Sequence, residues 1–108
     1  MVTIMTQGKN QDVYTYDQLK HLILPLIRKY HASSALLFGS YARNEATENS
    51  DIDLVIIGGE DFLPADVFSI AEDLHVMSGK AVDVYELREL NKGTPFYNRV
   101  LREGVTIQ

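Results

Sequence analysis

The chain has 108 residues, which is enough for one domain with a modest hydrophobic core. Hydrophobic residues at 45% and charged residues at 23% are typical of a globular protein, and the absence of cysteine excludes disulfides and thiolate metal sites. A net charge of −5 argues against sequence-independent binding of nucleic acid, but a local site could still bind a small phosphate ligand.

Residues 1–14 are expected to form a loose or weakly paired arm, with Val2 and Ile4 at alternating apolar positions. They lack the basic segment and long apolar run of a signal peptide. The longest apolar run, LILPLI at 22–27, is too short to cross a bilayer. We therefore expect a cytoplasmic protein without membrane association.

A helix is predicted over residues 16–30. Thr15 and Gln18 have the spacing of a capping box. Pro25 should kink this helix or divide it into two short pieces. The apolar residues that follow helical spacing are Leu19, Leu22, Ile23, Leu26 and Ile27.

The rest of the chain alternates between short strands and helices. Strands are predicted at 34–38, 51–57, 81–87 and 105–107, a brief helix at 40–46, and longer helices around 67–77 and 95–103. Gly79 should end the helix around 67–77, and Thr94 followed by Pro95 should begin the last one. This order predicts a single α/β (α+β) domain, with its core at about 15–107 and its helices packed on one face of a small mixed sheet.

Three aspartates are expected to converge at one edge of this sheet. Alternation along a strand places the side chains of Asp51 and Asp53 on one face, away from the core. The side chain of Asp83 points away from the core for the same reason. The helix between their two strands suits a crossover between parallel strands, which sets the two strand starts side by side. If the first two strands are antiparallel, residues 39–40 also lie next to Asp51.

Such a cluster needs neutralisation. Two carboxylates about 4 Å apart repel by roughly 4 kcal/mol at an effective dielectric near 20, so either their pKa values rise or a cation binds. Oxygen ligands suit Mg²⁺, and Gly39 with Ser40, at the start of the short helix, could hold a phosphate. The combination indicates phosphoryl or nucleotidyl transfer.

Each feature also has an ordinary structural explanation. An Asp-x-Asp pair is more often a solvated strand end, Gly39-Ser40 could be a simple turn, and Asp83 could protect an edge strand from aggregation. Only their joint spacing favours a site.

The stretch from Gly39-Ser40 through ten residues to Asp51-Ile52-Asp53 resembles the signature of the minimal nucleotidyltransferases (MNT) of the DNA polymerase β superfamily. The flanking LLFGSYAR and SDIDLVI, and the later VDV, match as well, and the resemblance extends from about 16 to 105. One departure is Asn44, where relatives often have glycine.

The resemblance implies a polymerase β-like fold and roles for six residues. Gly39 and Ser40 would hold the β- and γ-phosphates of a nucleoside triphosphate, most simply ATP. Arg43 would either touch the triphosphate or form a structural ion pair with Glu45 or Glu48. The aspartates Asp51, Asp53 and Asp83 would be catalytic and bind two Mg²⁺ ions, and the third would also help to activate the attacking hydroxyl.

Short members of this family resemble the antitoxin half of toxin–antitoxin pairs. The implied partner is a helical HEPN toxin, silenced by transfer of AMP to a tyrosine, and direct nucleic-acid binding is not expected. Two alternatives stay open: a non-catalytic module that neutralises its partner by binding alone, and a small-molecule nucleotidyltransferase of the aminoglycoside-modifying type. Base preference, acceptor and oligomeric state do not follow from the sequence.

Overall fold

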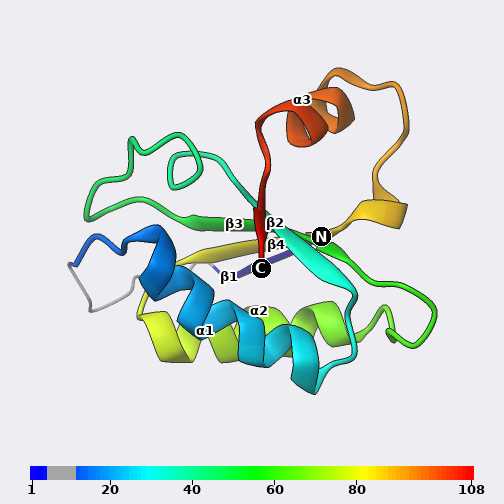
Figure 1. Cartoon of the computed structure of the whole chain (residues 1–108), viewed down its shortest axis with the longest axis horizontal. Coiled ribbons are helices and arrows are strands. Elements are labelled where there is room, and N and C mark those ends of the chain that lie inside the picture. Colours follow the sequence, from blue (N-terminus) through cyan, green and yellow to red (C-terminus); the bar gives the residue numbers. More distant parts are fainter. Residues whose placement is uncertain (5–11) are drawn as a thin grey trace.

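The structure is a computed structural model that describes residues 1–4 and 12–108, and its described part contains a five-stranded sheet with helices on both sides (Figure 1). The elements in chain order are β1 (Val2–Ile4), α1 (Tyr16–Lys29), β2 (Ser34–Phe38), β3 (Ile52–Ile57), α2 (Asp66–Ser78), β4 (Val82–Glu86), the 3₁₀-helix η1 (Leu87–Glu89), α3 (Pro95–Glu103) and β5 (Val105–Ile107).

The sheet is mixed, as predicted, with the strand order β1-β4-β3-β2-β5. β3 and β4 pair in parallel and are joined by α2, whereas the other neighbouring pairs are antiparallel. Within the expected arm, residues 2–4 form an edge strand against β4, and residues 12–15 have no regular structure. Residues 5–11 of the arm lie outside the described part.

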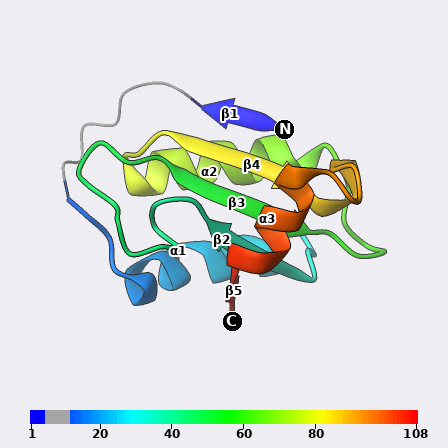
Figure 2. The ribbon, with the colours of Figure 1, turned by 90° about the horizontal axis from the view of Figure 1, so that it is seen from above.

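The helices do not all pack on one face, which corrects one detail of the predicted fold class. α1 and α2 cover one face of the sheet, and α3 lies across the other (Figures 1 and 2). Leu54 and Ile56 of β3 belong to the large core under α1 and α2, while Val55 joins Val100 of α3 in a second, smaller core. The central strand is therefore apolar on both faces beyond Asp53, and both faces need cover.

The ends of the helices follow the predicted signals. Thr15 and Gln18 form a complete capping box at the start of α1, and Gly79 ends α2 in the left-handed conformation at φ 70°. α1 continues through Pro25 as one element, so the predicted division is wrong. Its buried side, which includes Leu19, Ile23 and Leu26, holds the helix against the core on both sides of the proline. None of the helices in the described part of the chain is long and apolar enough to span a membrane.

Candidate active site

The predicted carboxylates meet at one edge of the sheet. In the parallel pairing of β3 with β4, Asp53 lies directly opposite Asp83. Asp51 immediately precedes β3 and is exposed, whereas Asp53 and Asp83 are half-buried. Strand alternation puts Asp53 and Asp83 on the α3 side of the sheet, together with Val55 and away from the large core. The topology predicted from the sequence therefore brings all three aspartates together.

Their proximity changes their acidity. The pKa of Asp53 rises from 3.8 to about 7, first because of burial and then because of the charge of Asp83, a hydrogen bond with Asp83 and the charge of Asp51. The pKa of Asp51 is also raised, by burial and by the charge of Asp83. Oδ1 of Asp83 is buried and has no hydrogen-bond partner among the described residues. The edge of the sheet thus holds negative charge and an unused oxygen acceptor, both of which favour a bound cation.

The turn after β2 packs against this pair. Gly39 has φ 73°, and a Cβ atom built on it would collide with Oδ2 of Asp53. Only glycine therefore allows the turn to approach the carboxylate this closely.

The predicted helix over 40–46 is wrong, because this segment is an irregular turn. The amide of Arg43 donates to the Gly39 carbonyl at 3.1 Å and that of Glu45 to the Ser40 carbonyl at 2.9 Å, which is not a regular helical pattern. Asn44 has φ 58°, a left-handed conformation that asparagine tolerates and glycine adopts easily. This conformation is compatible with asparagine at the position where the family resemblance led us to expect glycine.

The turn still provides donors for an anion. Within the described residues, the backbone amides of Ser40, Tyr41 and Ala42 donate no hydrogen bond to a protein acceptor. Consecutive free amides in a tight turn form a concave site that suits a phosphate oxygen. The turn, rather than a helix N-terminus, is thus the part that could bind phosphate.

Arg43 forms an ion pair, one of the two roles considered for it. Its Nε lies 3.1 Å from Oε2 of Glu45, and both side chains are largely exposed, so the pair adds little stability. The positive charge of Arg43 also lowers the pKa of Asp53, against the larger effects that raise it. The guanidinium is therefore close enough to the carboxylates to influence them.

Lys80 is a residue of this region that the sequence analysis missed. It is 3% exposed, and its Nζ donates to the carbonyl oxygen of Glu48 at 2.8 Å. This bond joins the end of the α2–β4 connection to the loop that carries Asp51. No local pattern marks a lysine before a strand as buried, because its acceptor lies 32 residues away.

Three aromatic side chains cluster on the α3 side of the sheet, where Phe38 and Tyr85 lie beside the carboxylates and Phe96 packs on both rings. Phe38 is opposite Asp53 in the β2–β3 pairing, and its ring centroid is 5.8 Å from those of Tyr85 and Phe96. Burial and the two aspartates raise the pKa of the Tyr85 hydroxyl. The carboxylates therefore have an aromatic wall on one side.

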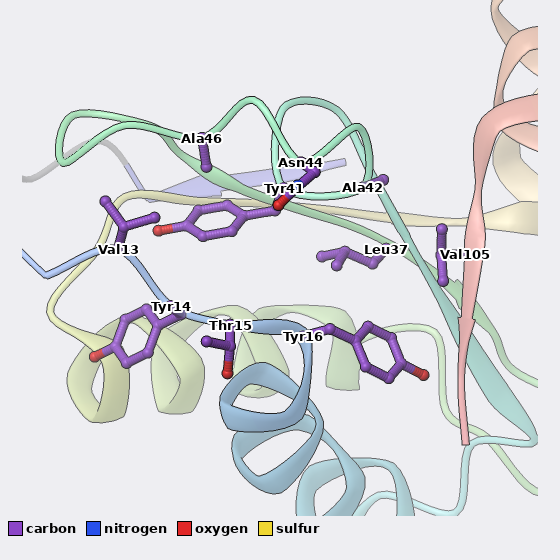
Figure 3. A pocket seen from close by; sticks show the side chains of 10 residues that line it. All are labelled: Val13, Tyr14, Thr15, Tyr16, Leu37, Tyr41, Ala42, Asn44, Ala46 and Val105. Atoms are coloured by element: carbon purple, nitrogen blue, oxygen red, sulfur yellow. The ribbon is translucent and has the colours of Figure 1, made fainter.

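A cavity of about 430 Å³ lies on the other side of the turn (Figure 3). Figure 3 shows Tyr41, from the turn, across from Tyr14 and Tyr16 at the start of α1. Leu37 belongs to the large core, so this cavity is on the α1 side of the sheet, and no carboxylate lines it. Its lining residues are Val13, Tyr14, Thr15, Tyr16, Leu37, Tyr41, Ala42, Asn44, Ala46 and Val105.

The donor chemistry fits a hard divalent cation, although the side chains alone do not complete its coordination. Among residues 1–4 and 12–108 there is no group of three or more His, Cys, Asp or Glu side chains placed to hold a metal ion. Mg²⁺, however, commonly takes one or two carboxylates together with phosphate oxygens of the substrate. The Asp53–Asp83 pair and the unpaired Oδ1 of Asp83 suit that mode of binding.

Paired carboxylates beside a glycine-serine turn on a mixed sheet are an arrangement that suits phosphoryl or nucleotidyl transfer. The family model "Polymerase beta, Nucleotidyltransferase" matches residues 20–108. The chain therefore belongs to the polymerase β nucleotidyltransferase family, as the motif predicted.

Similar proteins agree with this assignment. A "Putative protein adenylyltransferase" of Methanocaldococcus jannaschii is 34% identical over 91 residues, which cover 84% of this chain and 96% of the relative. A solved structure of a "putative minimal nucleotidyltransferase" superimposes with a TM-score of 0.70 at 29% identity, covering 85% of this chain and 95% of the other. The MNT antitoxin in complex with a tri-AMPylated HEPN toxin of Shewanella oneidensis shares the fold, with a TM-score of 0.66, 21% identity and coverage of 87% and 72%.

Proposed function

We propose that this nucleotidyltransferase transfers AMP from ATP to a tyrosine hydroxyl of a HEPN-type toxin and thereby acts as its antitoxin. The observation that carries the proposal is the Asp53–Asp83 pair: Gly39 lies close to Asp53, and burial together with the charge of Asp83 raises the pKa of Asp53 to about 7. Such a pair is unfavourable for the folded chain alone and becomes useful once a cation and a triphosphate neutralise it. The name of the archaeal relative and the AMPylated toxin in the Shewanella complex support AMP as the transferred group.

In this proposal the turn binds the triphosphate. The free amides from Ser40 to Ala42 would donate to the β- and γ-phosphates, and Gly39 would let these phosphates approach the carboxylates. Arg43 is close enough to contribute positive charge if it leaves Glu45. These contacts orient the α-phosphorus for in-line attack, with pyrophosphate as the leaving group.

The carboxylates would bind Mg²⁺ and handle the proton. Asp51, Asp53 and Asp83 would hold two ions together with substrate oxygens, and bound Mg²⁺ supplies positive charge that stabilises the transferring phosphoryl group. Asp83 would accept the proton of the attacking tyrosine hydroxyl, and its buried Oδ1 without a hydrogen-bond partner supports this role. The new bond joins the tyrosine oxygen to the α-phosphorus, and the bond from that phosphorus to pyrophosphate breaks.

The test combines the purified chain with a purified candidate HEPN-type partner, ATP and Mg²⁺. The mass of the partner should rise by one or more AMP units, and peptide mapping should place them on tyrosine. The variant Asp53→Asn should bind the partner but transfer nothing. An unchanged partner mass with each of the four nucleoside triphosphates would exclude this acceptor, and full neutralisation by Asp53→Asn would favour a non-catalytic antitoxin.

A further inference from the structure

Asp51 is the carboxylate of the candidate site that the sheet fixes least. It lies outside the strands, since β3 begins at Ile52. On its C-terminal side the chain is held by the Ile52 amide, which donates to the Ala81 carbonyl at 2.9 Å. On its N-terminal side the chain is an irregular loop that follows the Gly39 turn. The position of the Asp51 carboxylate therefore depends on how this loop is held.

The last part of the loop is a local turn over residues 47–50. The Thr47 amide donates to Oγ of Ser50 at 2.8 Å, and the Ser50 amide donates back to the Thr47 carbonyl at 3.0 Å. These bonds close the turn on itself and do not anchor it to the sheet. Within the described part of the chain, the hydrogen bond that joins the turn to a distant segment is the one from Nζ of Lys80 to the Glu48 carbonyl, at 2.8 Å. A single ammonium group therefore anchors the turn that leads into the aspartate.

Lys80 is buried without a carboxylate partner. It is 3% exposed, and no ion pair joins its ammonium to an acidic side chain within residues 1–4 and 12–108. Taking a charge out of water is unfavourable unless hydrogen bonds compensate for it. The compensation that the structure shows is the backbone carbonyl of Glu48, and a hydrogen bond from a charged donor is stronger than one between neutral groups. This bond is thus needed by the lysine and well suited to fix the turn.

The ammonium does not act on the aspartate directly. Lys80 is buried like Val82, two residues later, which belongs to the large core, whereas Asp83 faces the α3 side of the sheet. The pKa of Asp51 is raised by burial and by the charge of Asp83, and Lys80 is not among the causes. Any effect of Lys80 on the site must therefore pass through the backbone of the turn.

We propose that Lys80 is a positioning residue, which fixes the 47–50 turn so that the Asp51 carboxylate can share a divalent cation with Asp53. This inference rests on the proposed function, because it takes Asp51 as a ligand of the cation. Asp53 and Asp83 need no such support, since the β3–β4 pairing fixes them opposite each other. The same parallel pairing sets the loop before β3 beside the start of β4, which Lys80 precedes (Figure 2). One lysine thus ties the carboxylate outside the strands to the segment that leads into β4.

The first test uses the metal-free chain and does not depend on activity. Lys80→Met removes the donor and keeps an unbranched side chain. Hydrogen exchange of the Ser50 and Ile52 amides, which flank the aspartate, should become at least about tenfold faster. The matched control Ile23→Val destabilises the core at α1 without touching the turn, and it should change the exchange of these amides less than about threefold. Equal exchange in Lys80→Met and in the control would overturn the inference.

The second test measures the affinity for Mg²⁺-ATP by isothermal titration without an acceptor. Lys80→Met should weaken binding at least about tenfold in the wild-type background and less than about threefold in the Asp51→Asn background, because the carboxylate that it positions is then absent. Ser50→Ala opens the same turn and leaves the lysine in place, so it should show the same dependence on Asp51, and it decides the question if Lys80→Met does not fold. Equal weakening in both backgrounds is what a purely structural role predicts, and it would overturn the inference.

These outcomes differ from a failure of the proposed function. A wild-type chain that binds no Mg²⁺-ATP would overturn the proposed function and, with it, the role of Asp51 as a cation ligand. A chain that passes both tests but transfers no AMP to the HEPN-type partner would support the inference and exclude that acceptor.

Discussion

Replacing Asp53 with asparagine should make the metal-free protein more stable while it removes activity. Asp53 lies opposite Asp83 and next to Gly39, and its pKa is about 7 because burial and its two neighbouring carboxylates disfavour its charge. Asparagine has nearly the same shape and carries no charge. The substitution therefore relieves the repulsion and leaves the packing almost unchanged.

The magnitude follows from the difference in pKa between the folded and unfolded chains. The pKa of Asp53 rises from 3.8 to about 7, which corresponds to roughly 4 kcal/mol at about 1.36 kcal/mol per pKa unit. Because the side chain is partly exposed, solvent screening reduces this figure, and we expect about 2 kcal/mol. Below about pH 4 the carboxyl is protonated in both states. Between about pH 4 and pH 7 only the folded state keeps the proton, so the free energy of unfolding falls as the pH rises.

The assay is urea denaturation at pH 4.5 and pH 8 in the presence of EDTA. At pH 8 the free energy of unfolding of Asp53→Asn should exceed that of the wild type by about 2 kcal/mol, and at pH 4.5 the two should differ by less than about 1 kcal/mol. The control is Asp61→Asn, which removes an exposed carboxyl outside the site and should not stabilise the chain at pH 8. If Asp53→Asn is as stable as the wild type at pH 8, or less stable, the carboxylates do not repel as the structure indicates.

Three further predictions test other parts of the site. Gly39→Ala should lower the free energy of unfolding by about 1–3 kcal/mol and abolish AMP transfer, because the new Cβ would collide with the carboxylate of Asp53 at a residue with a left-handed backbone. A variant that melts and transfers AMP like the wild type would contradict this. Lys80→Met should lower the free energy of unfolding by about 1–3 kcal/mol in urea, because the Glu48 carbonyl loses its donor, while the exposed Lys92→Met should not. When Mg²⁺-ATP is present at about 100 times its dissociation constant from the chain, it should stabilise the folded state by about 2.7 kcal/mol in thermal melts. Asp83→Asn should lose most of that stabilisation. An unchanged melting midpoint of the wild type would count against the site.

Much of the fold and of the candidate site could be predicted from local sequence patterns. The capping box at Thr15 and the apolar spacing after it placed the start of α1, and Gly79 placed the end of α2. Strand alternation assigned Asp53 and Asp83 to the face away from the large core. These features depend on residues close together in the chain, where helix and strand periodicity leave few arrangements.

Other features required the tertiary structure. α3 covers the face of the sheet on which Val100 packs with Val55 in the smaller core, and these two residues are far apart in the sequence. The segment after Gly39 forms a turn rather than a helix, since a short helix has too few hydrogen bonds to be stable by itself, and Gly39 at its start lies close to Asp53.

The sequence by itself determined the family, the order of the elements from α1 to β5 apart from η1 and the wrongly predicted helix over 40–46, and the three aspartates of the candidate site. Only the tertiary structure decided how close the Gly39 turn lies to Asp53, that Lys80 is buried against the loop before Asp51, and that Phe68 and Val76 stay exposed on α2. The physical reason is that residue type and spacing act along the chain, whereas burial, pKa and surface exposure depend on which distant segments come into contact.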